Sequence, residues 1–462
     1  MTQAIGEPRE PYFPHLRTAL IFTGTGTAGA YHAGVLRALQ ETGIKIDLVA
    51  GAGVGAATAL FAAIDASAQL SADSSFWRSP ASSTLYPVRR FPKFIFFLLV
   101  ASLLSVIVPL LAVVAGLLVF PISYFLGMLG IGIGAEASRG VVTWLYDMFE
   151  PSALPSILPR IAVLSLMAAL AALLVAALIA RLRETRLEGA FWWTGLGPLL
   201  DVWPAIVEWR ERLWRALAGG PLGKQPGNRD LSGRCVDVLA ENLGQPGFRE
   251  LLLVVHDLDA RRDLVFALLT ERLRREFFSK RGSGGPRPAE AFDLAGLARE
   301  HLVDVLSASL CLPVVTAAYP LAFRPDGYWR GETHRLTTRP ESVARLIEEV
   351  DRAGATQIIV VAGAPEPPGP HGQRERPGDA RSQAGEYVTS IEGASVRDAV
   401  VAALEARKNL YVIQPAYNPL NALDFSGRFD RLSNRHSTIA ELVERGYEDA
   451  HRQFIEPVVA SV

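Results

Sequence analysis

The chain has 462 residues, of which 50% are hydrophobic and 20% are charged, and its formal net charge is −1. A near-neutral chain carries no basic field to attract nucleic acid, so we expect no nucleic-acid partner, and the apolar content excludes disorder of the whole chain. Its two cysteines, Cys235 and Cys311, are too few for a disulfide framework or a four-cysteine zinc site, and we expect no metal. The mean hydropathy of +0.22 favours membrane-embedded segments.

The chain before Phe94 alternates between strand-like and helix-like patterns. The apolar run Thr18–Phe22 is followed by the glycine turn GTGTAG and by a helical pattern that ends at Gly43. A second strand, Ile46–Gly51, leads through the glycine turn GAGVGA into a second helical pattern. Such strand-turn-helix units build parallel sheets, so we expect an α/β fold with a mostly parallel sheet flanked by helices.

Two long apolar runs then interrupt this pattern. We expect membrane helices at about 94–119 and 160–180, because a spanning helix needs roughly 20 apolar residues. Arg89 precedes the first run and Arg183 follows the second, so the positive-inside rule places both flanks in the cytoplasm. The sequence therefore predicts a multi-pass membrane protein with an inserted transmembrane hairpin and a cytoplasmic α/β domain.

The α/β pattern resumes at Glu250, with further strands at Gln357–Gly363 and Asn409–Pro415. Five tryptophans between the hairpin and Glu250 are expected to anchor amphipathic helices at the membrane interface. They are Trp192, Trp193, Trp203, Trp209 and Trp214. The predicted organisation is an N-terminal tail (1–17), a first part of the α/β domain (18–88), the hairpin insertion (89–186), an interfacial helical segment (187–249), a second part of the α/β domain (250–364), a flexible proline-rich loop (365–385), and a C-terminal strand and helix of the same domain (386–462).

The two glycine turns have two interpretations. GTGTAG matches the G-x-G-x-x-G pattern of dinucleotide-binding folds, but that interpretation leaves the second turn unexplained. Taken together, the turns supply a loop of backbone N–H groups that can act as an oxyanion hole and a strand-to-helix elbow that can present a nucleophile.

This second arrangement resembles the patatin-like phospholipase family, which reads G-G-G-x-R/K-G-x-x-x-x-G-V-L and then G-T-S-x-G-A. The matching segments here are GTGTAGAYHAGVLRAL and IDLVAGAGVGAA. Downstream, LLLVVHDLDARRDLVF, SASLCLPVVTAAYPLAFRPDGYWRGE and GATQIIVV are similar to later parts of the family pattern. The resemblance covers Thr18–Ala68 and Glu250–Ala364, with the apolar hairpin as an insertion.

The resemblance implies hydrolysis of lipid acyl esters by a Ser–Asp dyad without metal or cofactor, so membrane lipids are the expected partners. It also implies two groups of site residues. The oxyanion loop comprises Gly24, Thr25, Gly26, Thr27, Ala28 and Gly29, and the elbow comprises Gly51, Ala52, Gly53, Val54 and Gly55.

The sequence departs from the family pattern at several of these positions. Gly53 stands at the nucleophile position and has no side chain, Thr25 replaces a glycine, and Ala28 replaces a basic residue. The family aspartate corresponds either to Asp326, within a good turn sequence, or to Arg330 if that turn precedes the aspartate strand.

We therefore predict a catalytically impaired, membrane-anchored pseudo-hydrolase that binds lipid or acts as a scaffold. The alternative is an active lipid acyl hydrolase with a non-standard site, and a dinucleotide-binding protein is a minor alternative. Substitute nucleophiles would come from Thr25, Thr27 or Thr58, although capping or packing is the ordinary role of such residues. His32 and His256 lie near the matched segments, but the family dyad needs no histidine.

Overall fold

The structure, a computed structural model, describes most of the chain and separates it into two compact units. The described residues are 12–72, 75–130, 133–149, 157–183, 197–218, 223–279, 287–327, 329–366, 378–406, 409–430 and 432–460. Unit 1 comprises Met1–Pro87 and Asp201–Val462, and unit 2 comprises Val88–Leu200.

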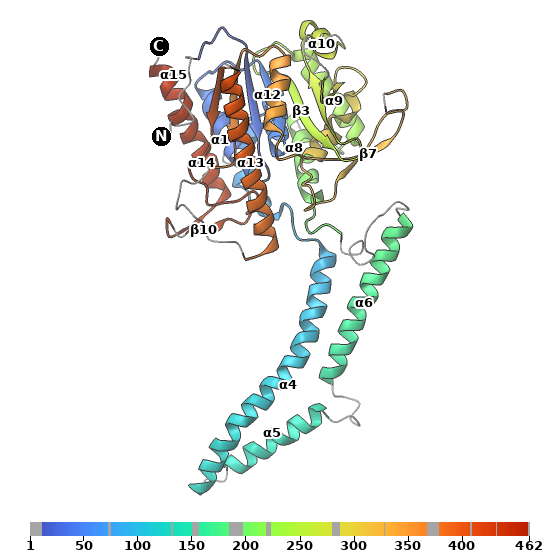
Figure 1. Cartoon of the computed structure of the whole chain (residues 1–462), viewed down its shortest axis with the longest axis vertical. Coiled ribbons are helices and arrows are strands. Elements are labelled where there is room, and N and C mark those ends of the chain that lie inside the picture. Colours follow the sequence, from blue (N-terminus) through green and yellow to red (C-terminus); the bar gives the residue numbers. More distant parts are fainter. Residues whose placement is uncertain are drawn as a thin grey trace. The chain divides into compact units, whose positions relative to one another are not determined.

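Unit 1 is built on a nine-stranded sheet (Figure 1). Seven strands follow one another across it in the order β5 (Glu290–Asp293), β4 (Arg262–Leu268), β3 (Glu250–Asp257), β2 (Leu48–Ala52), β1 (Thr18–Thr23), β8 (Gln357–Ala362) and β9 (Asn409–Ile413). The hairpin of β6 (Tyr319–Ala322) and β7 (Thr333–Thr337) joins the sheet where β7 pairs with β3, and β10 (Arg428–Asp430) with β11 (Arg435–Ser437) forms a separate ribbon.

The strand pairings confirm the predicted mostly parallel α/β sheet. β1 pairs in parallel with β2 and with β8, β2 with β3, and β8 with β9. The antiparallel pairs are β3 with β4, β3 with β7, and β6 with β7. Because the carboxyl ends of β1 and β2 are neighbours, the two glycine turns that follow these strands lie side by side.

Helices cover both faces of this sheet. They are α1 (Ala28–Glu41), α2 (Val54–Ala63), α3 (Ala68–Ser71), α8 (Trp203–Ala218), α9 (Asn228–Asn242), α10 (Glu271–Phe278), α11 (Leu302–Ser309), α12 (Val343–Arg352), α13 (Ala380–Glu405), α14 (Ile439–Ala450) and α15 (Glu456–Ala460). Short helices occupy Phe76–Arg78, Pro80–Thr84, Arg299–His301 and His451–Ile455. Figure 1 shows α12 and α13 side by side over the sheet, where they form one core with alternate strand residues such as Ala19 and Ile21.

The opposite face is covered by α1, α2 and α14, and glycines set their close approach. A Cβ on Gly34 of α1 would lie 1.8 Å from the carbonyl oxygen of Val443 in α14. A Cβ on Gly446 of α14 would lie 2.2 Å from the carbonyl oxygen of Tyr31. The two helices therefore touch backbone to backbone, and α1 is held firmly behind the glycine loop.

Two sequence predictions for unit 1 need correction. Trp209 is not an interfacial anchor: it is 1% exposed and packs on Phe61, Phe76 and Trp77, because α8 closes the core beside α2. Trp192 and Trp193 lie outside the described residues. The proline-rich loop is also shorter than predicted, since the Asp379 side chain caps α13 by accepting the Ser382 N–H, and the helix begins at Ala380.

Unit 2 consists of three described helices, α4 (Arg90–Met128), α5 (Ile133–Phe149) and α6 (Ile157–Arg183). α4 packs along both α5 and α6, and the Ser102 hydroxyl donates to the Ala162 carbonyl of α6 at 3.2 Å (Figure 1). The windows Arg90–Ile107 and Arg160–Leu182 are long and apolar enough to cross a membrane, with mean hydropathies of 1.9 and 2.7. The ends of the unit meet in an antiparallel bridge between Val88 and Leu200.

Candidate active site at the carboxyl edge of the sheet

The turn between β2 and α2 has the geometry of a sharp strand-to-helix elbow. Gly53 alone separates the two elements, at φ +62° and ψ −140°, a conformation that side chains disfavour. The flanking glycines permit close packing: a Cβ on Gly51 would lie 2.3 Å from the Gly55 carbonyl oxygen, and one on Gly55 would lie 2.2 Å from that of Phe22. The chain thus has the backbone of a strand-to-helix elbow, with a glycine at its sharpest point.

The glycine loop between β1 and α1 lies next to this elbow and is covered by the segment 418–425. The Thr27 N–H donates to the Ala422 carbonyl at 3.1 Å, and the Thr27 hydroxyl donates to the Asn421 carbonyl at 2.8 Å. A Cβ on Gly26 would lie 1.9 Å from the Ala422 carbonyl oxygen, so the segment 418–425 can pack on the loop only if residue 26 is a glycine. The backbone N–H of Thr27 is therefore already hydrogen-bonded to the protein's own backbone.

The Gly24 carbonyl group lies directly against the elbow. The Val54 N–H donates to the Gly24 carbonyl oxygen at 3.0 Å. In hydrolases with such an elbow, the N–H of the residue after the nucleophile is one of the oxyanion donors. A Cβ built on Gly53 would lie 2.3 Å from the same Gly24 oxygen. The Gly24 carbonyl oxygen therefore accepts the Val54 N–H and lies against the place that a side chain on residue 53 would occupy.

The side chain that faces the elbow from the β7 strand is Thr338, which the sequence analysis missed. Its hydroxyl oxygen lies 3.4 Å from the ideal Cβ position on Gly53, and the residue is 2% exposed. The Thr338 N–H is fixed by the Cys311 carbonyl at 2.8 Å. Thr338 directly follows β7, and its place at the elbow depends on how the β6–β7 hairpin pairs with β3, which no local pattern in the sequence indicates.

The two sequence candidates for the aspartate lie at the other end of β7. Asp326 and Arg330 belong to the turn between β6 and β7, where the Gly331 N–H donates to the Arg324 carbonyl. The five residues of β7 rise about 3.4 Å each, so this turn is roughly 17 Å from Thr338. The Asp326 carboxylate is 52% exposed and pairs with Arg324 at 3.0 Å, which lowers the pKa of Asp326. Neither Asp326 nor Arg330 therefore lies close to the elbow.

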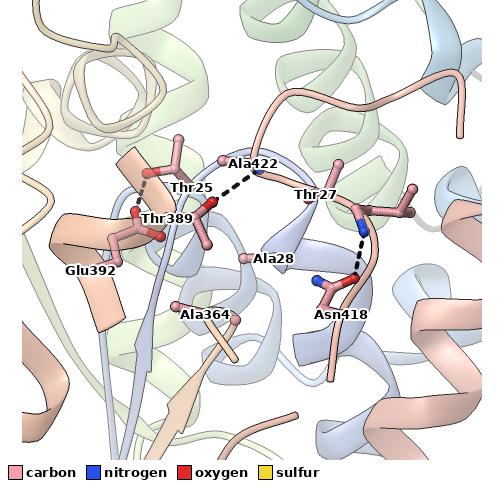
Figure 2. A pocket seen from close by; sticks show the side chains of 10 residues that line it. Thr25, Thr27, Ala28, Ala364, Thr389, Glu392, Asn418 and Ala422 are labelled. Atoms are coloured by element: carbon pink, nitrogen blue, oxygen red, sulfur yellow. Dashed lines mark hydrogen bonds between the residues drawn. The ribbon is translucent and has the colours of Figure 1, made fainter. Parts of the chain in front are cut away.

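A buried carboxyl group, Glu392 of α13, lies on the other side of the glycine loop and was also missed by the sequence analysis. Its side chain accepts a hydrogen bond from the Thr25 hydroxyl (Figure 2). Burial raises the pKa of Glu392 to about 7, which hydrogen bonding from Thr25 only partly offsets. Nothing in the local sequence EYVTSIEGAS distinguishes this glutamate from a solvent-exposed one.

Glu392 also lines a small cavity of about 10 Å³, enough for one water molecule. Figure 2 shows Thr25, Thr389, Glu392 and Asn418 around this cavity, with Ala28 beneath it. Ala28, at the family's basic position, packs on the chain after β8, because a Cβ on Gly363 would lie 2.2 Å from its Cβ.

The other residues that the sequence analysis considered, Thr58, His32 and His256, are packed within the fold or bonded to neighbouring residues. Thr58 is fully buried in α2, and its hydroxyl makes no hydrogen bond within the described part of the chain. His32 is buried, and its Nε2 lies 3.1 Å from the Thr23 carbonyl oxygen. Burial lowers the pKa of His32 to about 3, so the ring is neutral. His256 contacts Asp263 at 2.8 Å on the neighbouring strand β4.

These features define an α/β protein that carries a glycine loop and a strand-to-helix elbow at the carboxyl edge of a mostly parallel sheet. The model of the patatin-like phospholipase family matches residues 20–334, more than half of the chain, and the protein belongs to this family. The activity of the family is the hydrolysis of lipid acyl esters, and the predicted family resemblance is confirmed.

Comparisons with individual proteins add little to the family assignment. No curated protein matches the chain. Among solved structures, VipD from Legionella pneumophila is 15% identical at a TM-score of 0.31, and the alignment covers 96% of this chain and 67% of VipD. The type III effector protein ExoU is 12% identical at a TM-score of 0.31, with 96% of this chain and 54% of ExoU covered. The chain thus spans about half to two thirds of these proteins.

Proposed function

We propose that this protein is a membrane-anchored member of the patatin-like phospholipase family that has lost ester hydrolysis and acts as a lipid-binding or scaffold protein. The observation that carries the proposal is the elbow itself. Gly53 has no nucleophilic atom, and the Gly24 carbonyl accepts the Val54 N–H that an oxyanion would need. Removing a nucleophile leaves only the oxyanion and binding contributions to catalysis, and here the oxyanion donor is also taken.

The membrane part of the proposal rests on unit 2. α4 has 39 residues and α6 has 27, each longer than the roughly 20 residues that span a bilayer. Only 11% and 17% of the residues in their most apolar windows are buried, so these helices are not core helices within the described chain. A bilayer is the environment in which such apolar surface is stable. The arginines at both ends favour a hairpin with both flanks in the cytoplasm.

The test of this proposal is a hydrolysis assay combined with active-site labelling. The full chain, purified in detergent micelles, is incubated with mixed phospholipid–detergent substrate and with p-nitrophenyl butyrate, and separately with a fluorescent fluorophosphonate. We expect hydrolysis at the buffer rate and no covalent label. Turnover that is proportional to protein concentration, together with a labelled protein, would overturn the proposed loss of activity.

One observation favours a second candidate, an active hydrolase with a non-standard site. The Thr25 hydroxyl donates to the Glu392 carboxyl group, whose pKa of about 7 suits a general base. Against it, Thr25 is 3% exposed and the adjoining cavity of about 10 Å³ has no room for an acyl ester. If labelling occurs, peptide mapping of the adduct to Thr25 would identify this candidate, and the variant Thr25→Val would abolish the label.

A further inference from the structure

The carboxyl edge of the sheet, which holds the glycine loop and the elbow, also carries a set of exposed apolar side chains. Within the described residues of unit 1, six large apolar side chains are more than half exposed, and five of them lie at this edge. These five, called the apolar rim, are Trp203, Val314, Tyr387, Phe429 and Leu432. Single exposed apolar residues are ordinary, whereas a set gathered at one end of a molecule marks an interaction surface.

Contacts within unit 1 place the loop after α11 and the first turns of α13 at this edge. The Cys311 carbonyl accepts the N–H of Thr338, which lies beside the elbow, and Val314 follows three residues later. Tyr387 stands little more than one turn before Glu392 on α13, and the Glu392 carboxyl group meets the glycine loop. The helix therefore carries Tyr387 beyond the ends of the strands.

The ribbon of β10 and β11 directly follows the segment 418–425, which covers the glycine loop. At the end of this segment, the Phe425 ring lies 3.2 Å from the ideal Cβ position of Gly26. Phe429 lies in β10, and Leu432 lies in the turn between the two strands. Figure 1 shows β10 and one end of α13 at the same end of unit 1. Both side chains of the ribbon therefore belong to the carboxyl edge.

The two points at which the chain leaves and re-enters unit 1 lie at the same edge. The Tyr86 ring stacks on the Phe425 ring, with centroids 5.5 Å apart. The next residue, Pro87, accepts the Asp201 N–H at 2.9 Å, and Trp203 begins α8 two residues further on. The insertion that we propose to be membrane-embedded is therefore attached to unit 1 beside the apolar rim.

The rim has the chemistry of a surface that faces lipid. Val314 is 95% exposed at φ +67°, a strained conformation for a β-branched residue, so its side chain is held out into the surroundings. Trp203 and Tyr387 are of the residue types that gather at the headgroup level of membranes. The chain beside the rim is basic, since residues 86–93 contain three basic side chains and no acidic one, as suits an anionic lipid surface.

We propose that the apolar rim is a membrane-docking surface, by which the carboxyl edge of unit 1 rests on the bilayer that holds unit 2. This inference rests on the proposed membrane anchoring, because the tether beside the rim brings the bilayer within reach. Shallow insertion of exposed apolar and aromatic side chains is the way in which peripheral surfaces bind lipid. Docking would place the glycine loop and the elbow at the lipid surface, where a lipid-binding role requires them.

The docking is tested by fluorescence of the full chain, reconstituted in vesicles of phosphatidylcholine and phosphatidylglycerol. The variants Val314→Cys and Leu432→Cys are labelled separately with the polarity-sensitive dye NBD, and quenching by doxyl-labelled phosphatidylcholine is measured. Leu297→Cys is the matched control: this side chain is 60% exposed but follows β5, whose carboxyl end lies at the opposite edge because β4 and β5 run against β3. Leu110→Cys, in α4, reports whether unit 2 is embedded.

Docking predicts that the lipid quencher acts at least about threefold more strongly at positions 314 and 432 than at position 297. Quenching at position 110 without quenching at 314 and 432 would overturn the docking and leave the membrane anchoring intact. Water-like emission at all four positions would overturn the anchoring and the docking together. A blue shift at 314 and 432 that lipid does not quench, and that grows with the protein-to-lipid ratio, would assign the rim to a second copy of this chain and overturn the docking.

Discussion

The Thr338 hydroxyl oxygen lies 3.4 Å from the point where a Cβ on Gly53 would stand. At this separation a carboxylate at position 338 could reach a hydroxyl at position 53 with only small adjustments. We infer that a base could serve the elbow from the end of β7 and not from the preceding turn. A threonine, which is no base at neutral pH, occupies that place.

Gly53→Ser alone should therefore restore no hydrolysis, because the new hydroxyl has no base and collides with the Gly24 carbonyl. The double variant Gly53→Ser with Thr338→Asp should label with a fluorophosphonate more than either single variant, since a nucleophile and its base act as a unit. Gly53→Ser with Arg330→Asp is the control and should gain nothing. Robust ester hydrolysis by Gly53→Ser alone would contradict this assignment of the base position.

Glu392 should make the stability of the protein fall as the pH rises. Its pKa is raised by burial to about 7 in the folded state, against about 4.3 in the unfolded state, so folding takes up a proton between these values. The destabilisation develops between about pH 4.3 and 7 and is of the order of 4 kcal/mol at most. Glu392→Gln should remove this pH dependence in urea unfolding at pH 5 and 8, whereas Glu386→Gln should leave it intact.

His334 should also make the protein more stable at low pH than at high pH, but through a charged ring that stabilises the fold. Burial alone would lower the pKa of His334, but hydrogen bonds with Asp257 and Glu332 outweigh burial and raise it. The charged ring thus stabilises the fold fully below the unfolded pKa of about 6.5, and this stabilisation is lost as the pH rises through the higher folded value. His334→Gln should cost about 2 kcal/mol at pH 5.5 and less at pH 8.5. His436→Gln, at an exposed position, is the control; an equal cost of His334→Gln at both pH values would contradict the shift.

Two helical glycines should respond oppositely to alanine. Gly34→Ala puts a Cβ 1.8 Å from the Val443 carbonyl oxygen and should destabilise unit 1 by about 3 kcal/mol. Gly233→Ala, in α9, meets only the Arg299 side chain at 3.7 Å and should be neutral or stabilising by up to about 1 kcal/mol. Equal unfolding midpoints for the two variants would show that α1 and α14 are not in backbone contact.

The hairpin topology predicts that both ends of unit 2 face the same side of a membrane. Arg89→Cys and Arg183→Cys should label equally with a membrane-impermeant maleimide in inside-out vesicles and not in right-side-out vesicles. Background labelling is expected to be low, because burial raises the pKa of Cys235 and Cys311 to about 12 and both are at most 1% exposed. Labelling of the two positions from opposite sides would contradict the hairpin.

The sequence predicted the sheet well, because its strands are continuous apolar runs and its turns are glycine signatures. Thr18–Phe22 and Ile46–Gly51 became neighbouring parallel strands, although the second begins at Leu48. Trp209 was misassigned because an aromatic residue on an amphipathic helix has the same pattern at a membrane interface and in a core. Thr338 and Glu392 could not be found, since their roles arise from contacts with residues about 285 and 367 positions away.

The bridge between Val88 and Leu200 has a consequence for the connectivity of the chain. The chain enters and leaves unit 2 at adjacent points, since antiparallel bridge partners have Cα atoms about 5 Å apart. A two-residue hairpin turn can span that gap, so the 111 residues between the partners can be exchanged for a short Asn-Gly link without rerouting either end. The insertion is in this sense a detachable module, and we expect a single deletion to rejoin the two parts of the α/β unit.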